Sequence, residues 1–519
     1  MVKTFFNHST ATDTAMNGKR LDVVPSCGAV RRTSTLQSLK QSLIGRGPMK
    51  LNYDVLERIM EFLSPWDILQ VMQACRTLRR LGIPILLRFV HICGHPFSQE
   101  REMRFDLYRW HLFRDLSRFS YVLYLIVPYG MIDDKPVMQY LTYPTRYRFT
   151  DVLHHFNRLQ FLDLTMGCDD LNPTVYNWII SLKDLRGLKF REIGPVADHI
   201  VQVLEHLNPQ MDLLHLDQPR MRDGFVLDPL PLLQAQPCVA TLTGLLVEAK
   251  SEHAGPHIPA NGAPFARVHT LVWHSATRVE TVHLMRAFPA LRRLGITVSS
   301  VPWSREMLGA AREDAPSVLD VRLANADAQR RAPAARWDGL ERAMGDLLTL
   351  WSLALRCPVD AIETEINAER EARIGAKMGH LLGLMHDVTP REITVLIRPS
   401  HINQLERVLV FPTLRRLDVT VRIYAFPDIL DEIKGLFERI EVSPLQRLRI
   451  AIKPGSGVRP SRFLPVLPLS ARGHRVIKFL RTKMPDIEEI TIDLWPRWKE
   501  HTWKRGESDV PPPDDKPCA

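Results

Sequence analysis

The feature that most constrains the fold is a three-point pattern, apolar-x-x-apolar-x-apolar, that recurs along most of the 519-residue chain. The copies are Val122/Leu125/Val127, Leu159/Leu162/Leu164, Leu185/Leu188/Phe190, Met211/Leu214/Leu216, Leu242/Leu245/Val247, Val268/Leu271/Trp273, Leu291/Leu294/Ile296, Leu350/Leu353/Leu355, Leu414/Leu417/Val419, Leu445/Leu448/Ile450 and Ile487/Ile490/Ile492. From Leu159 to Leu291 the starting positions are separated by 26, 26, 31, 26 and 23 residues. This spacing predicts an array of small units rather than one large core.

Each unit is expected to be a strand followed by a helix. The last two apolar positions of a triplet are two residues apart, as alternation along a strand requires, and the intervening segments have helical spacing. These helices are expected at Val175–Leu182, Val196–Leu207, Val279–Phe288, Ile429–Ile440 and Val476–Met484. A strand and a helix of this size cannot bury their apolar faces alone, so successive units should stack on one another.

The array resembles leucine-rich repeats, which share the period and the L-x-x-L-x-L pattern. The resemblance implies an α/β fold, an irregular strand–helix solenoid over residues 121–500. The pattern departs from the family because most units lack the usual asparagine and 59 residues separate Leu291 from Leu350. We therefore expect an insertion near residues 299–345, another helix over Ala361–Met385 and a degenerate unit near Ile393 and Val395.

The N-terminal stretch Met49–Ile92 has a different, purely helical pattern. Its first helix carries an apolar band made of Val55, Leu56, Ile59, Met60 and Leu63. A band this wide cannot be covered by a single neighbouring element. Ser64 and Pro65 then predict a second helix, because serine can cap free N–H groups and proline suits the first helical position. A third helical segment, Arg76–Leu87, should be interrupted at Gly82–Pro84, because proline removes a donor.

This stretch resembles an F-box, the short helical module that binds the Skp-type adaptor of a cullin–RING ubiquitin ligase. The residues that carry the resemblance are Leu51, Asp54, Val55, Leu56, Ile59, Leu63, Asp67, Ile68, Leu69, Ala74, Cys75 and Arg76. Asn52 stands where the family usually has proline, so the first turn should be capped differently. The resemblance implies that the adaptor, and through it a cullin, is bound by Leu51, Val55, Leu56, Ile59, Leu63, Ile68 and Leu69.

The remaining segments divide the chain further. Residues 1–48 are basic and aperiodic and are expected to be a disordered tail, although an organellar transit peptide is an alternative reading. The helical module should span residues 49–92, and a linking helical segment residues 93–120. Residues 501–519 form a proline-containing tail that is expected to be flexible.

Composition and missing signatures narrow the function. No apolar run is long enough to span a membrane. Seven scattered cysteines without a C-x-x-C pair favour free thiols in the cytoplasm or nucleus. A net charge of +10 is only a weak indication of nucleic-acid binding. The common catalytic, phosphate-binding and metal-binding signatures are missing, so we expect no enzyme activity, no cofactor and no metal.

A target-binding face is expected where intervening strand positions point away from the helices. Its basic members are Lys189, Arg191, His215, Arg293, Arg356, Arg416, Arg447 and Arg449, with Asp163, Asp217 and Asp418 beside them. Arginine forms bidentate pairs with carboxylates and phosphates, which favours an acidic or phosphorylated target protein. The alternative is that these charges only keep the strands solvated.

Together these patterns predict a substrate receptor of a Skp–cullin–F-box ubiquitin ligase. The helical module would dock the adaptor, and the repeat region would hold a target protein. The alternative is a non-catalytic leucine-rich-repeat interaction scaffold with no link to a ligase. The two hypotheses differ in whether Leu56, Ile59 and Leu63 are exposed or are buried by the chain itself.

Overall fold

The structure is a computed structural model of the whole chain. It describes residues 52–91, 115–127, 152–165, 173–191, 197–217, 229–248, 262–275, 279–298, 317–366, 371–423, 429–440, 443–454, 469–494 and 501–506. These residues belong to two compact units. The first contains the described residues before Leu87, here called the N-terminal module, and the second contains nearly all the others. The predicted tail 1–48, residues 507–519 of the predicted tail 501–519, and residues 93–114 of the predicted linking segment lie outside the described residues. The prediction that the C-terminal tail is flexible from residue 501 is wrong at its start, because His501–Lys504 form a strand paired with the preceding one.

The first two helices of the N-terminal module begin at capping side chains. Helix α2 spans Tyr53–Glu61, and the side chain of Asn52 accepts a hydrogen bond from the backbone N–H of Asp54 at 3.0 Å. Helix α3 spans Pro65–Met72. The Ser64 hydroxyl accepts from the Asp67 N–H at 3.2 Å and donates to the Asp67 carboxylate at 2.6 Å. The predicted break at Ser64 is confirmed, and Asn52 caps the turn where the family usually has proline.

The prediction that the third helical segment is interrupted is wrong. Helix α4 runs unbroken from Arg76 to Leu87 and contains Pro84. Packing explains why the helix tolerates proline there. A side chain at Gly82 would place its Cβ 2.4 Å from Met72 Cγ and 2.7 Å from Met60 Cε, so α4 lies directly against these two methionines. This burial, together with that of Leu86, offsets the single backbone hydrogen bond that proline removes.

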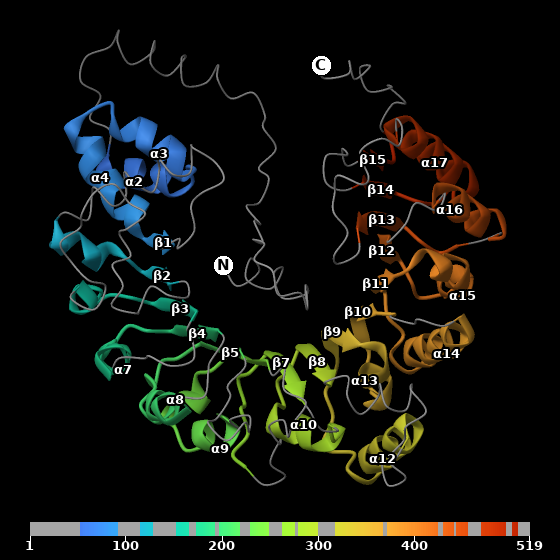
Figure 1. Cartoon of the computed structure of the whole chain (residues 1–519), viewed down its shortest axis with the longest axis horizontal. Coiled ribbons are helices and arrows are strands. Elements are labelled where there is room, and N and C mark those ends of the chain that lie inside the picture. Colours follow the sequence, from blue (N-terminus) through green and yellow to red (C-terminus); the bar gives the residue numbers. More distant parts are fainter. Residues whose placement is uncertain are drawn as a thin grey trace. The chain divides into compact units, whose positions relative to one another are not determined.

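The second unit is one sheet whose 15 strands follow each other in sequence order (Figure 1). The strands are β1 Phe89–His91, β2 Tyr124–Val127, β3 Phe161–Thr165, β4 Gly187–Arg191, β5 Leu213–Asp217, β6 Gly244–Glu248, β7 Thr270–Ser275, β8 Arg293–Val298, β9 Leu340–Asp346, β10 Val359–Glu365, β11 Glu392–Ile397, β12 Arg416–Ile423, β13 Arg447–Pro454, β14 Glu489–Leu494 and β15 His501–Lys504. Strand β15 is antiparallel to β14. The preceding pairs of neighbouring strands whose residue register the structure gives are all parallel.

Helices connect the strands and lie along one side of the sheet (Figure 1). They are η3 Leu116–Tyr121, η5 Leu153–His155, α7 Pro173–Ser181, α8 Ala197–Glu205, α9 Pro229–Gln234, η6 Pro237–Ala240, α10 Thr281–Ala287, α12 Val318–Arg331, α13 Leu347–Ser352, α14 Glu371–Val388, η7 Pro399–Leu405, α15 Glu406–Leu409, α16 Ile429–Glu438 and α17 Leu469–Lys483. None of the helices in the described residues is long and apolar enough to cross a membrane.

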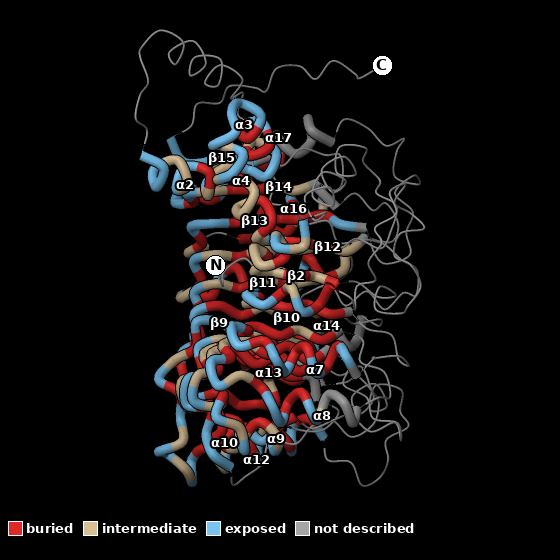
Figure 2. The backbone as a smooth tube through the Cα atoms, turned by 90° about the vertical axis from the view of Figure 1, so that its left-hand side faces the viewer, coloured by how far each residue is buried: buried red, intermediate tan, exposed pale blue. Residues whose placement is uncertain are grey.

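The apolar triplets build the core between the sheet and these helices. Their middle positions pair across neighbouring strands, as in Leu162 with Leu188, and their last positions pair likewise, as in Leu164 with Phe190. All four side chains are completely buried. Figure 2 shows buried residues recurring from strand to strand along the sheet. Because the units cannot bury these positions alone, stacking stabilises each one through its neighbours.

One triplet is not a strand. Leu350, Leu353 and Leu355 were predicted to mark a repeat, but residues 347–352 form helix α13. Asp346 caps this helix by accepting from the Thr349 N–H at 2.9 Å. Leu347 and Leu350 are both buried and lie three residues apart, so they share one side of the helix. The first two positions of the triplet pattern have the same spacing, which is why the pattern did not distinguish this helix from a strand.

The predicted insertion contains part of a repeat unit. Residues 299–316 lie outside the described residues, but α12 and β9 supply a helix and a strand before residue 346. Strand β9 pairs with β8 and β10. The pairing with β8 needs a glycine, because Gly345 has a φ of +155° and a Cβ there would lie 1.8 Å from the Ile296 carbonyl oxygen.

The predicted helix over Ala361–Met385 is wrong in its first part. Strand β10 occupies Val359–Glu365, and helix α14 begins only at Glu371. Within β10, Ile362 is buried in the sheet. The degenerate unit expected near Ile393 and Val395 is confirmed as β11.

Candidate adaptor-binding and target-binding surfaces

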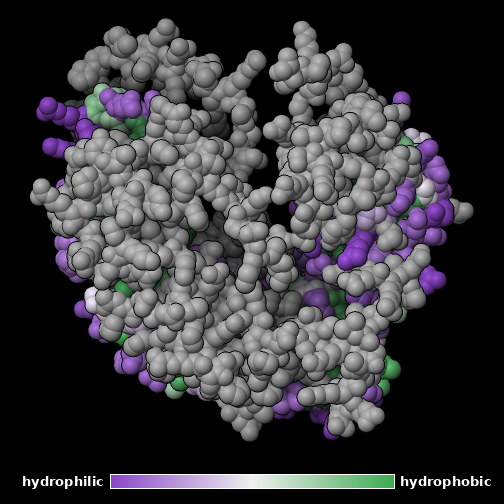
Figure 3. Space-filling model, viewed as in Figure 1, coloured by the Kyte–Doolittle hydropathy of each residue, from purple (hydrophilic) through white to green (hydrophobic). Residues whose placement is uncertain are grey.

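Helix α2 carries apolar side chains on two faces. Met60 is buried, and Leu56 and Leu63 are half-buried, so one face packs inward. Val55, Ile59 and Phe62 follow the spacing i, i+4 and i+7 and are 49%, 50% and 81% exposed. Because residues at this spacing lie on one side of a helix, the three form a continuous stripe, called here the apolar stripe. In Figure 3 hydrophobic surface lies over the N-terminal helices beside strongly hydrophilic surface.

The apolar stripe is bordered by a charged pair. The Arg58 guanidinium lies 2.8 Å from a Glu61 carboxylate oxygen and 5.8 Å from the centroid of the Phe62 ring. The charge of Arg58 is thus balanced by Glu61, and its guanidinium covers part of the Phe62 ring. Tyr53 and Trp66 are further exposed aromatic residues of this module. A stripe of exposed apolar side chains with a polar border is typical of a protein-binding surface.

The structure separates the residues predicted to bind the adaptor into three groups. Val55 and Ile59 lie on the apolar stripe, whereas Leu56 and Leu63 are only partly exposed. Ile68 and Leu69 are 4% and 8% exposed, so they offer almost no surface for contact. Leu51 lies outside the described residues.

The sequence analysis did not predict Phe62 as an adaptor-binding residue. It is the most exposed large apolar side chain among the described residues. The family pattern does not include its position. Its helical spacing from Val55 and Ile59 was the available signal.

The basic residues predicted to bind a target are largely paired within the sheet. Arg293 Nε lies 3.1 Å from a Glu341 carboxylate oxygen, and Arg416 makes two hydrogen bonds to Asp418 at 2.9 and 3.3 Å. Asp418, with Glu392 and Glu489, also raises the pKa of Arg416 despite its partial burial. Because each guanidinium already has a carboxylate, these arginines are poorly placed to attract a further anion.

The same pairing continues at the C-terminal end of the sheet. Arg449 Nη2 lies 3.1 Å from Asp493, and Arg447 Nε lies 3.9 Å from Glu489. Both pairs join β13 to β14. Arg293, Arg447 and Arg449 are therefore arranged in cross-strand ion pairs, and Arg416 in a pair within its own strand, which fits the alternative in which these charges mainly solvate and align the strands.

The other predicted target-binding residues lie in different surroundings. Lys189 and His215 face each other across the β4–β5 pair, where His215 is buried and Lys189 half-buried. Arg191 is the last residue of β4, and its side chain is not among those that the structure describes. The assignment of Arg356 to a strand is wrong, because it lies between α13 and β10.

An aromatic row at the start of the sheet was not foreseen. Phe89, Tyr124 and Phe161 occupy paired positions on β1, β2 and β3. Their ring centroids are 6.3 and 6.1 Å apart. Phe161 also extends over β4, where a Cβ on Gly187 would lie 2.3 Å from its ring. The beginning of the sheet is therefore aromatic on the face where its later strands carry ion pairs.

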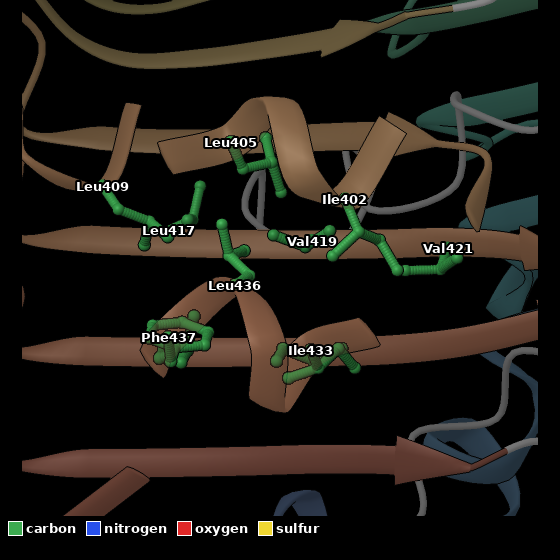
Figure 4. A pocket seen from close by; sticks show the side chains of 11 residues that line it. Ile402, Leu405, Leu409, Leu417, Val419, Val421, Ile433, Leu436 and Phe437 are labelled. Carbon is green, nitrogen blue, oxygen red and sulfur yellow. The ribbon is translucent and has the colours of Figure 1, made fainter. Parts of the chain in front are cut away.

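The described residues hold no group of histidine, cysteine and acidic side chains suited to a metal ion. Burial raises the pKa of the Cys238 and Cys357 thiols to about 11, which keeps both protonated and unreactive near neutral pH. The cavity shown in Figure 4 lies between β12, η7 and α16 and is lined only by aliphatic and phenyl side chains, including Leu405, Val419 and Phe437. Such a lining has no group that could act as an acid, base or nucleophile.

Comparison with known protein families finds one match. Residues 49–82 match the model of the F-box domain. The chain carries an F-box domain. F-box domains generally bind Skp-type adaptors of cullin-containing ubiquitin ligases. The match starts at the first residue of the predicted module and ends within α4, before the predicted limit at residue 92. No curated protein matches the chain.

Proposed function

We propose that the protein is a substrate receptor of a Skp–cullin–F-box ubiquitin ligase. Its F-box domain docks a Skp-type adaptor, and the strand–helix region, a leucine-rich-repeat-like solenoid, holds a target protein. The receptor has no active site of its own and acts by raising the effective concentration of the target near the ubiquitin-carrying enzyme.

The observation that carries this proposal is the apolar stripe on the matched F-box domain. A helix that leaves Val55, Ile59 and Phe62 exposed while its opposite face is packed is suited to a second protein. Burying each side chain on docking would contribute about 1.5–3 kcal/mol. Exposure of Leu56, Ile59 and Leu63 was expected to separate this proposal from the interaction-scaffold alternative. Ile59 is 50% exposed, which supports docking, whereas Leu56 and Leu63 are half-buried and favour neither hypothesis.

The test replaces the apolar stripe in the full-length protein. We expect Val55→Asp, Ile59→Asp and Phe62→Asp together to abolish co-purification of a Skp-type adaptor and a cullin. Leu319→Asp with Leu323→Asp is the matched control, because these helix α12 residues are 52% and 55% exposed and lie outside the F-box domain. Adaptor binding that survives the triple replacement, in a protein with an unchanged circular dichroism spectrum, would contradict the docking proposal.

The target-binding part of the proposal concerns the sheet face opposite the helices. This face offers the aromatic row of Phe89, Tyr124 and Phe161 at one end and ion-paired strands at the other. Proteins that co-purify with both wild type and the stripe variant, but not with Tyr124→Ala or Arg449→Ala, would be candidate targets. If Tyr124→Ala loses these proteins, the aromatic end of the face binds the target. If Arg449→Ala loses them, the ion-paired end does.

A further inference from the structure

Charge is divided unevenly along the F-box domain. Residues 52–72 contain four acidic side chains and one basic side chain. Residues 73–82 contain no acidic side chain and three arginines, Arg76, Arg79 and Arg80. The first turn of α4 likewise has no acidic residue. The positive charge of the domain is therefore concentrated at the beginning of one helix.

The three arginines share one side of α4. They occupy positions i, i+3 and i+4, and all three are exposed. We call them the arginine triad. Among the described residues no carboxylate is recorded within ion-pair distance of any of them. This differs from Arg416, Arg447 and Arg449, each of which has an acidic partner.

Three guanidinium groups on one helical turn, without an ion-pair partner among the described residues, repel one another and lie at the positive end of the helix dipole. This arrangement is unfavourable in the isolated protein. It becomes favourable when carboxylates from a partner approach the same face.

We propose that the arginine triad binds an acidic patch of the Skp-type adaptor and accelerates its association with the F-box domain. This inference rests on the proposed function and adds the chemistry of the partner surface. The apolar stripe provides most of the stability of the complex, and the triad provides attraction between the approaching proteins. Long-range attraction of this kind raises the association rate more than it slows dissociation.

The charge distribution favours a protein over a nucleic acid. A phosphate backbone is negative along its whole length, and the four acidic side chains of residues 52–72 in the same domain disfavour it. A folded protein can place its own acidic residues opposite α4 alone. The exposed apolar stripe on the same domain also has no role in binding phosphates.

The test measures adaptor association with the full-length protein at about 0.02 M and 0.5 M salt, because exposed charges are screened over about 10 Å at 0.1 M and about 3 Å at 1 M. Arg76→Glu, Arg79→Glu and Arg80→Glu together should lower the association rate about 10- to 100-fold at low salt and much less at high salt. Arg76→Gln, Arg79→Gln and Arg80→Gln should have a smaller effect in the same direction. The matched control, Arg407→Glu with Lys478→Glu and Lys483→Glu, makes the same charge change at exposed positions of the repeat region and should leave the rate nearly unchanged.

The possible failures are distinguishable. If the wild-type protein does not bind the adaptor, the proposed function itself is wrong. If the adaptor binds but both triad variants, with unchanged circular dichroism, associate at the wild-type rate and with the wild-type salt dependence, the inference is overturned. Loss of binding to a single-stranded RNA in the triad variants, with unaltered adaptor binding, would also overturn it and assign the triad to nucleic acid.

Discussion

The F-box domain and the repeat sheet use the same residue types in opposite ways. In the sheet, apolar triplet positions such as Leu188 and Leu214 are completely buried, because each strand is covered by a helix and by the next unit. In the F-box domain, Ile59 and Phe62 remain exposed on a helix whose other face is packed. Apolar side chains therefore stabilise the fold in one region and remain exposed in the other.

The arginines show the same contrast. Those on the strands lie beside carboxylates of the same strand, as Arg416 does, or of the neighbouring strand, as Arg447 and Arg449 do, whereas the arginine triad on α4 has no such neighbour among the described residues. A sheet brings side chains of different units side by side, so opposite charges can be paired within the chain. A short helical module has fewer neighbours, so the arginine triad stays exposed, although Arg58 is paired with Glu61 on its own helix. The comparison teaches that residue type alone does not separate structural from binding roles.

The largest expected effect tests the contrast in burial. Leu188→Ala should lower the free energy of unfolding of the repeat region by about 3 kcal/mol, because it removes a fully buried side chain and leaves a cavity. Ile59→Ala should change stability by less than about 0.5 kcal/mol. Urea denaturation followed by circular dichroism measures both. Equal losses in the two variants would mean that Ile59 is part of a core, which would end the comparison.

A second prediction concerns the buried polar contacts of the repeat region. The Asn325 amide accepts from the Thr281 N–H at 3.0 Å and donates to the carbonyl oxygens of Val279 and Ser352 at 3.1 and 2.9 Å. Asn325→Ala leaves these buried groups without their partner and should cost about 2 kcal/mol. The exposed Asn403 is the control, and Asn403→Ala should have a much smaller effect on the urea midpoint. Similar midpoints for both variants would show that the Asn325 contacts add nothing.

A third prediction uses a helix cap that occurs in both regions. Ser64 begins α3 of the F-box domain, Ser317 begins α12 of the repeat region, and each accepts from a backbone N–H three residues on at 3.2 Å. Ser64→Ala and Ser317→Ala should each cost about 1 kcal/mol, seen as lower thermal midpoints. Only Ser64→Ala should also weaken adaptor binding, because α3 begins three residues after Phe62 of the apolar stripe and its start helps to fix the end of α2. Ser→Thr at either site is the control and should retain most of the cap.

The smallest effect concerns pH and the repeat region. His380 packs against Trp351 with the two rings tilted and their centroids 4.2 Å apart, and burial, followed by the charges of Arg322 and Lys377, lowers its pKa below the ordinary 6.5. Folding therefore favours the neutral ring. Its stabilising contribution is fully present above pH 6.5 and declines as the pH falls through the lowered pKa. Thermal midpoints at pH 7.5 and 5.5 should differ less in His380→Phe than in wild type, and an equal difference would contradict this assignment.

Much of the fold could be predicted from the sequence. The triplets ending in Leu164, Phe190 and Leu216 marked strands correctly, because a position two residues from its apolar neighbour lies on the same side of a strand. The cap at Ser64 was equally predictable, since its chemistry is local. The errors arose where a pattern is ambiguous. Leu350 and Leu353 satisfy both the triplet and helical spacing, and only packing against the rest of the unit selects the helix.

The candidate sites were less predictable than the elements that carry them. The family pattern treats Ile59 and Ile68 alike, yet the structure exposes the first and buries the second. Sequence spacing placed Arg447 and Arg449 on one strand face, but their carboxylate partners lie 42 and 44 residues away on β14. A pairing between distant segments depends on strand register, which a single sequence does not encode locally.

The sequence by itself determined the repeating strand–helix units, the caps that begin the N-terminal helices and the place of the F-box domain, because each depends on residues within a few turns or on a periodic pattern. The tertiary structure decided which apolar residues are left uncovered and which arginines are paired, because exposure and charge balance depend on neighbours brought together from distant parts of the chain.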